Sequence, residues 1–518
     1  MAMSLKSINN LVEELLQSRQ NCNKIVDLIP LINFEEKEEV LNVILDGVGT
    51  YFCNAICNNE LTKQKGVSKE MSEYQEWINI RYNECLAKIV LLLDHESDIL
   101  KEKCIVTVLR FMESKIGVAL QKDNVSFPET ELESLICAFI INDTSNHMQD
   151  VCMNIWKLDD VRYFALKCIT KCSAECLSKI ELKSMMLQNI FTLLSSISES
   201  MPTVMDETNL HTLANNGVER IFPAVNKDPA VTEKYQDSSI PFPKALDLKE
   251  QRKIFGNAWL EFLNYDLDSH LFKSVLVILQ KCVIPNFASP CILADFLTRS
   301  FNKGGGIALL SLHSLFILMN EHNLEYPDFY THLYSMVHPR VFDAKYQPRF
   351  FFLLDVFLSS THLPAYLVAA FAKRLSRLTL VAPTCAQELL VNFIQTLIDR
   401  HPSIKILINQ NTKALQKKAL AGDPYLEAEV DPAKCKAMES SLWELTALSK
   451  HCSSSVSAAI KNIDKGPKQD ITDLLENTYE EMFDTLCEKE IVDAPMNYRA
   501  PKTLFGGFDD AVMELWSV

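Results

Sequence analysis

Apolar residues recur at helical spacing along most of this 518-residue chain. The stretches LAKIVLLL (86–93), CIVTVLRFM (104–112) and LESLICAFII (132–141) each place apolar side chains on neighbouring turns of a helix. Polar connectors such as DHESD and NDTSNH separate these stretches, and strand-like alternation is not sustained anywhere in the chain. The pattern therefore predicts an all-α protein with many consecutive helices.

Two changes in composition divide the chain. Residues 1–200 read as an N-terminal helical array, and residues 201–246 read as a connector with short helices, because five prolines interrupt a stretch of mixed polarity. A second helical domain is expected at 247–451, followed by an acidic tail at 452–518. Short connectors between many helices favour a HEAT- or armadillo-like α-solenoid of stacked antiparallel helix pairs.

The segment around Phe350–Leu358 is the most apolar candidate core helix. Pro348 suits a first helical turn, and a helix that is apolar on all sides is expected to be buried on all sides. Asp355 interrupts the segment and would need a partner there, for which a basic residue across the next turn is a candidate. The residues predicted to form the buried core of this helix are Phe350, Phe351, Phe352, Leu354 and Phe357.

The next helix is predicted to begin at Pro364 and to cover the first one. At 100° per residue, Leu367, Val368, Phe371, Leu375 and Leu378 share one arc. The opposite arc presents Tyr366, Lys373, Arg374 and Arg377, which form the candidate contact face. This face is either a plain solvated surface or a contact with RNA phosphate or an acidic partner.

Charge and cysteine content narrow the class of protein. The net charge is −16, which argues against a nucleic-acid binder that uses its whole surface, although residues 303–418 carry 12 Lys and Arg against 7 Asp and Glu.

The 16 cysteines and the amphipathic N-terminus predict a reducing compartment. Cys168, Cys172 and Cys176, and likewise Cys53 and Cys57, are spaced for core packing rather than for zinc. No membrane span is expected, since no run of about 20 apolar residues occurs.

The sequence contains none of the usual motifs for catalysis, cofactor binding or metal binding. The glycine-rich stretch NKGGGIALLSL lacks the Lys-Ser/Thr ending of a phosphate loop, and no strand precedes it. The histidines form no H-E-x-x-H pattern, and no G-x-S-x-G elbow occurs. We therefore expect no enzyme activity, no cofactor, no metal and no small-molecule substrate.

The same region resembles a known family. The resemblance is carried by LEYPDFY, the phenylalanine-rich helix, SSTHLPAYLVAAFAKRLSRL and DPAKCKAMESSLWEL. The chain resembles the CCAAT-binding-factor-like (CBF) domain family, and within it the nucleolar complex protein 4 group. The stretch TYEEMF of this chain also resembles the tail of that group. The resemblance is dense from about 301 to 451. It implies an α-solenoid of the nucleolus that acts in small ribosomal subunit assembly, 18S rRNA precursor processing and pre-40S export.

The resemblance also implies partners. These are nucleolar protein 14, as a heterodimer, other proteins of the small-subunit processome, and the 18S rRNA precursor through direct or indirect contact. The alternative function is a DNA-binding transcription factor or coactivator of the CCAAT-binding-factor type, although neither a basic recognition helix nor a zinc module is visible. An enzyme in the N-terminal half is a third option, which a polar pocket there would favour.

Overall fold

The computed structural model describes residues 5–34, 36–61, 69–121, 127–142, 155–176, 183–201, 247–408, 422–461, 471–475 and 479–488. Within these ranges the regular structure is helical and no strand occurs. The chain divides into two compact units, Met1–Tyr326 (unit 1) and Pro327–Val518 (unit 2). The predicted connector at 201–246 belongs to the sequence of unit 1, and all of it except Met201 lies outside the described residues.

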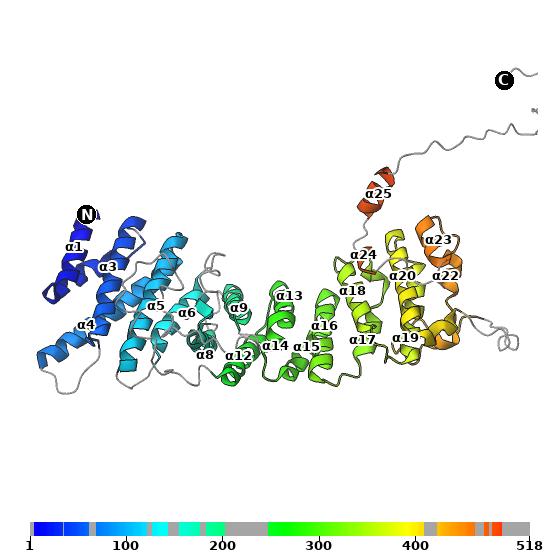
Figure 1. Cartoon of the computed structure of the whole chain (residues 1–518), viewed down its shortest axis with the longest axis horizontal. Helices are drawn as coiled ribbons and strands as arrows, with labels where there is room; N and C mark the ends of the chain where they lie inside the picture. Colours follow the sequence, from blue (N-terminus) through cyan, green and yellow to red (C-terminus); the bar gives the residue numbers. More distant parts are fainter. Residues whose placement is uncertain are drawn as a thin grey trace, which may run out of the picture. The chain divides into compact units, whose positions relative to one another are not determined.

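Unit 1 is a succession of helices (Figure 1). Its longer helices are α1 (Leu5–Gln17), α3 (Glu38–Cys57), α4 (Lys69–Leu91), α5 (Asp98–Gln121), α6 (Glu129–Ile141), α8 (Asp159–Cys176), α9 (Lys183–Glu199), α12 (Leu248–Leu263), α13 (Ser269–Ile278), α15 (Ala294–Phe301) and α16 (Gly305–His322). Shorter pieces are η1 (Arg19–Lys24), α2 (Ile25–Leu28), η2 (Ile29–Leu31), η3 (Leu92–Asp94), η6 (Leu279–Val283), α14 (Ile284–Asn286) and η7 (Pro290–Leu293).

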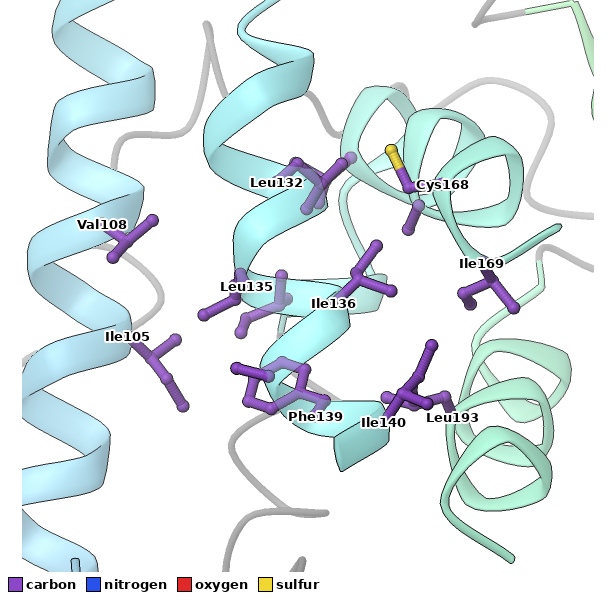
Figure 2. Packing of buried hydrophobic residues seen from close by; sticks show 14 of the residues in the cluster. Ile105, Val108, Leu132, Leu135, Ile136, Phe139, Ile140, Cys168, Ile169 and Leu193 are labelled. Carbon is purple, nitrogen blue, oxygen red and sulfur yellow. The ribbon is translucent and has the colours of Figure 1, made fainter. Parts of the chain in front are cut away.

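Helices of unit 1 pack mainly against helices close to them in chain order. Contacts join α1 to α3, α3 to α5, α4 to α6, α6 to α8, α8 to α12, and both α13 and α15 to α16. Figure 2 shows α6 between α5 on one side and α8 and α9 on the other, with Leu135 and Phe139 on the side of α5 and Ile136 and Ile140 facing α8 and α9. Each such buried side chain contributes about 1.5–3 kcal/mol. This sequential packing confirms the predicted all-α solenoid.

Local residue choices fix several helix ends and contacts in unit 1. Asp247 caps α12 by accepting the backbone N–H of Lys249 at 3.0 Å. Helix α16 starts after Gly304, whose φ of +75° is tolerated by glycine, and ends at Asn323 in the left-handed conformation. A Cβ at Gly47 would stand 2.3 Å from a methyl of Val12, so glycine allows α1 and α3 to approach closely.

A buried arginine joins α8 to α9 and α12 inside unit 1. Arg162 donates hydrogen bonds to the carbonyl oxygen of Ser200 at 3.2 Å and to Gln251 Oε1 at 3.0 Å, and it pairs with Asp159. Burial lowers the pKa of its guanidinium, while the Asp159 carboxylate favours the charged form. Because Ser200 and Gln251 lie on opposite sides of the connector in sequence, Arg162 fixes both of its ends.

Unit 2 contains α17 (Phe329–Met336), η8 (Pro339–Val341), α18 (Gln347–Phe357), α19 (Ala365–Thr379), α20 (Thr384–Arg400), η9 (Pro402–Leu407), η10 (Ala437–Glu439), α22 (Trp443–Leu448), α23 (Ser454–Lys461), α24 (Ile471–Leu474) and α25 (Tyr479–Glu488). Helix α19 packs against α20 and α22, and α20 packs against α23 and α24. The stretch expected to be an acidic tail thus begins with three helices, and its residues after 488 lie outside the described part.

Candidate functional site

Helix α18 is buried on one side only. Phe350, Phe351, Leu354 and Phe357 are buried, and the ring centroid of Phe351 lies 6.4 Å from that of Phe393 in α20. Phe352 is 46% exposed, so its predicted burial is wrong. At 100° per residue the buried positions share one arc, whereas position 352 falls opposite them and faces solvent.

Asp355 lies at the edge of the buried arc of α18 and does have a basic partner. Arg400 at the end of α20 donates two hydrogen bonds to this carboxylate, from Nη1 to Oδ1 at 2.6 Å and from Nη2 to Oδ2 at 3.1 Å. The partner comes from 45 residues further along the chain, not from the next turn as the sequence suggested. This fork geometry fixes the position of α20 against α18 as well as neutralising the carboxylate.

Lys373 is completely buried, and its predicted outward orientation is wrong. Its Nζ lies 2.7 Å from the carbonyl oxygen of Ser441, 2.7 Å from Glu444 Oε1 and 2.9 Å from Asp423 Oδ2. The physical reason is that residues 422–448 return across the face of α19 that a helical wheel assigns to solvent. A buried ammonium is stable there because its three donors all meet oxygen atoms.

The two arginines of the predicted contact face are also bound within unit 2. Arg377 Nη2 donates to Asp423 Oδ2 at 3.0 Å, and its Nε lies 3.0 Å from Glu444 Oε1. Arg374 Nε donates to the carbonyl oxygen of Val337 at 2.7 Å, and its guanidinium lies 4.4 Å from the ring centroid of Tyr334.

Of the four candidates on this face, Tyr366, 46% exposed, is the one that remains mainly in solvent. The three cations were expected to face either solvent or a partner, but they bind groups of unit 2 instead.

The carboxylate of Asp423 in this cluster is held in its charged form. Burial would raise the pKa of Asp423, but hydrogen bonds from Ser440 at 2.5 Å, from the Trp443 indole N–H at 2.9 Å and from Lys373 lower it well below its usual range. Ser376 donates to Glu444 Oε2 at 3.0 Å. In the resulting charge cluster of α19 and residues 422–448 (the α19 cluster), the cations and carboxylates bind one another, so its chemistry is structural.

No group of three or more His, Cys, Asp and Glu side chains in the described part of the chain is placed to hold a metal ion. Cys168 and Cys172 are buried as predicted, whereas Cys53 is partly buried and Cys57 is exposed, so the core assignment is wrong for Cys57. The side chain of Cys176 lies outside the described residues.

One described helix, α3, is long and apolar enough to cross a membrane by length and composition. Helix α3 contacts α1 and α5, and 61% of its most apolar window is buried inside the protein. That burial is typical of a core helix in a helical array.

The structure exposes a different basic surface, which sequence reasoning missed. Arg340, Lys345 and Arg349 are exposed between η8 and the first turn of α18, and the exposed ring of Phe352 follows three residues after Arg349. We call these four residues the α18 surface. The signal was present in the sequence, because positions 349 and 352 share one side of a helix. The assumption that α18 is buried all round concealed it.

Comparisons with known proteins agree with this architecture. The CBF/Mak21 family model matches residues 308–460, and the model described as "Nucleolar complex protein 4-like, TPR repeats" matches residues 2–179. The chain is similar to the nucleolar complex protein 4 homologs of Gallus gallus (33% identical, 97% of each chain covered) and Mus musculus (34%, 98% of this chain and 97% of the relative). The Homo sapiens homolog is 33% identical, with 97% and 95% covered.

These relatives match nearly the whole length of the chain, and their names place them in the nucleolus. The chain is accordingly a nuclear, nucleolar protein, as expected, and its membership supports a role in ribosome biogenesis there. One family model describes TPR repeats and the other the CBF/Mak21 family, and neither description names an enzyme. With near-complete coverage at about one third identity, the chain belongs to the nucleolar complex protein 4 family.

Proposed function

We propose that this protein is a non-enzymatic assembly scaffold for the small ribosomal subunit. It acts in processing of the 18S rRNA precursor and in export of the pre-40S particle, as part of the small-subunit processome. The observation that carries the proposal is the match to nucleolar complex protein 4 homologs over 97% of the chain. A solenoid suits this role, because stacked helices present extended surfaces to several partners at once.

The internal chemistry of the protein supports a scaffold. The polar clusters described in the two units are built from hydrogen bonds and ion pairs between residues of the same chain, so they stiffen the array instead of facing a substrate. Lys373 and Glu444 illustrate this, because both side chains have no exposed surface. A catalytic acid or base needs to reach the proton that it transfers, which these groups cannot do.

Nucleolar protein 14 is the proposed protein partner, in a heterodimer that joins the processome. The cations of α19 are not available for it, since Lys373 and Arg377 bind Asp423 and Glu444 of the same chain. Tyr366 remains an exposed candidate on this helix. Contact with the 18S rRNA precursor is proposed as a second interaction, separate from the protein contact.

The test is conditional depletion in cells, read out by blots of pre-rRNA and by sucrose-gradient profiles. We expect unprocessed 18S precursors to accumulate and free 40S subunits to fall, with large-subunit rRNA maturing normally. Re-expression of the wild-type chain should restore the profile. A matched loss of 60S subunits, or an unchanged 18S precursor pattern, would contradict a small-subunit role.

The protein contact has its own test. Purified chain and purified nucleolar protein 14 should co-elute in size-exclusion chromatography after nuclease treatment. Elution as two separate species would rule out the heterodimer while leaving the processing phenotype to stand or fall independently.

A further inference from the structure

We propose that Cys137 and Cys172 form a reversible disulfide bond between α6 and α8 when the protein meets a peroxide, and that this bond locks the two helices together. The two residues lie 35 positions apart in sequence, on helices that pack against each other. Both side chains are thiols in the structure. The inference assigns an oxidative modification site in unit 1 and is independent of the proposed function.

The two sulfur atoms are already in contact. Sγ of Cys137 lies 2.8 Å from Sγ of Cys172, and a hydrogen bond joins them. A disulfide bond is about 2.05 Å long, so bond formation requires the sulfurs to approach by less than about 1 Å. Cys172 Sγ also lies 4.0 Å from the carbonyl oxygen of Glu133 in α6, which shows that its side chain points toward that helix.

Neighbouring contacts hold α6 and α8 in the register that the thiol pair needs. Lys171 Nζ lies 2.6 Å from Glu133 Oε1, so an ion pair joins the same two helices beside Cys172 and one turn from Cys137. Figure 2 shows Ile136 of α6 facing α8. Close packing of this kind restricts the sliding of one helix past the other that would separate the two sulfurs.

The two thiols differ in exposure and in acidity. Cys137 is partly exposed, whereas Cys172 is fully buried. The hydrogen bond with Cys137, together with burial, raises the pKa of the Cys172 thiol, so Cys172 keeps its proton. Cys137 is therefore the sulfur that reacts first with a peroxide, and Cys172 is the sulfur that resolves the product.

The reaction balances with hydrogen peroxide as the oxidant. The Cys137 thiolate attacks one oxygen atom, the O–O bond breaks, and a sulfenic acid forms on Cys137 while hydroxide leaves and takes up the proton that Cys137 lost. The sulfur of Cys172 then attacks the sulfenic sulfur. The S–S bond forms, the S–O bond breaks, and the leaving hydroxyl takes the proton of Cys172. The two thiols lose two electrons in total, and the peroxide is reduced to two molecules of water.

The compartment gives the pair a reason to be reversible. A nuclear protein is kept reduced, and disulfides in reducing compartments are usually transient and redox-sensing. The bond between Cys137 and Cys172 would close a loop of 35 residues. Such a closure restricts the unfolded chain and so stabilises the folded one. The contact between α6 and α8 is thus stiffened under oxidising conditions and released when thiols are regenerated.

The test uses the full chain, which is reduced with dithiothreitol, separated from the reductant and treated with a molar excess of hydrogen peroxide. Remaining thiols are blocked with N-ethylmaleimide, and mass spectrometry of a non-reduced digest locates the disulfide. We expect a peptide pair that links Cys137 to Cys172 and that dithiothreitol separates again. Hydrogen exchange of peptides from α6 and α8 should be slower in the oxidised protein than in the reduced one.

Three variants assign the role of each sulfur. Cys137→Ser should abolish the linkage. Cys172→Ala should abolish it as well, but should leave a sulfenic acid on Cys137 that dimedone labels. The matched control, Cys57→Ser, changes an exposed cysteine of α3 and should leave the linkage intact. Oxidation should raise the Tm of the wild-type protein by about 3 °C or more and leave that of Cys137→Ser unchanged.

Three results would overturn the proposal, and each is obtained with the wild-type protein, so none depends on how a variant folds. After peroxide treatment and unfolding, Cys137 and Cys172 could both still react with N-ethylmaleimide while the exposed Cys57 is oxidised. The linkage could instead join Cys137 to Cys168, one turn away from Cys172 on α8. Finally, the linked protein could have a lower Tm than the reduced one, which would show that native packing does not accommodate the bond.

Discussion

Replacing Lys373 by methionine tests the claim that the α19 cluster holds unit 2 together. Methionine keeps the length of the side chain but removes its charge and its three donors. In the variant, the buried carboxylate of Glu444 and the half-buried carboxylate of Asp423 lose the cation that lies 2.7 and 2.9 Å from them. Residues 422–448 would then be less firmly bound to α19.

The magnitude follows from the burial of the pair. Removing one partner of a buried ion pair costs about 3–5 kcal/mol, because it leaves an uncompensated charge in the interior. Arg377 still contacts both carboxylates, with 24% of its side chain exposed, so we expect the lower end, about 3 kcal/mol. For a unit of this size, that loss corresponds to a fall in Tm of about 6–12 °C.

The assay is thermal and urea unfolding of the full chain, with hydrogen exchange of peptides from 422–448 to locate the effect in unit 2. Lys405→Met, at an exposed position, is the control and should change stability by less than about 0.5 kcal/mol. The double variant Lys373→Met with Glu444→Leu should regain most of the stability that Lys373→Met loses. The coupling free energy between the two positions should be about 1–3 kcal/mol.

If Lys373→Met lowers the free energy of unfolding by less than about 1 kcal/mol, the buried pair contributes no more than a surface salt bridge, which would refute its role in holding unit 2 together. A double variant as unstable as the sum of its single changes would do the same.

Further predictions concern packing, pH and thiol reactivity. Phe351→Ala should destabilise unit 2 by about 3–5 kcal/mol in urea unfolding, whereas the exposed neighbour Phe352→Ala should cost less than about 1 kcal/mol; equal losses would contradict the orientation of α18. Because the folded pKa of Asp423 is lowered, its charge stabilises the fold above the unfolded pKa of about 3.9 and loses this effect as pH falls further. The Tm difference between wild type and Asp423→Asn should thus be constant from about pH 5 to 8 and shrink below about pH 4. A Tm difference that grows in acid would contradict a lowered pKa of Asp423 in the folded protein. Burial raises the pKa of the Cys104 thiol to about 12, so iodoacetamide at about pH 8 should label the exposed Cys57 in the native protein and Cys104 only after unfolding, as read by mass spectrometry of digests.

Helical periodicity was sufficient to predict the elements of unit 2 that matter here. Helix α19 begins after Pro364, and Phe350, Phe351, Leu354 and Phe357 of α18 are buried, because a buried face has to repeat with the turn of the helix. The α-solenoid followed in the same way from many amphipathic segments with short connectors. These features depend on residues close together in sequence.

The errors concern contacts between residues far apart in sequence. The partners of Lys373 and Asp355 lie 71 and 45 residues away, and a helical wheel cannot tell which later segment returns over a given face. The charged side chain of Lys373 on the amphipathic helix α19 was therefore assigned to solvent, although it is buried inside unit 2. The opposite error, at Phe352, came from treating a strongly apolar run as buried on every side.

The contacts of Arg162 have a consequence for chain length in unit 1. Arg162 binds both Ser200 and Gln251, and the Trp259 indole N–H donates to Ser198 Oγ at 3.2 Å, so these contacts hold the two stretches that flank 202–246 side by side. Lengthening a loop whose ends are already fixed costs only about 0.6 kcal/mol per doubling. Relatives are thus free to vary this insert during evolution, and it is the natural place to introduce a fluorescent protein or a protease site without disturbing the stack.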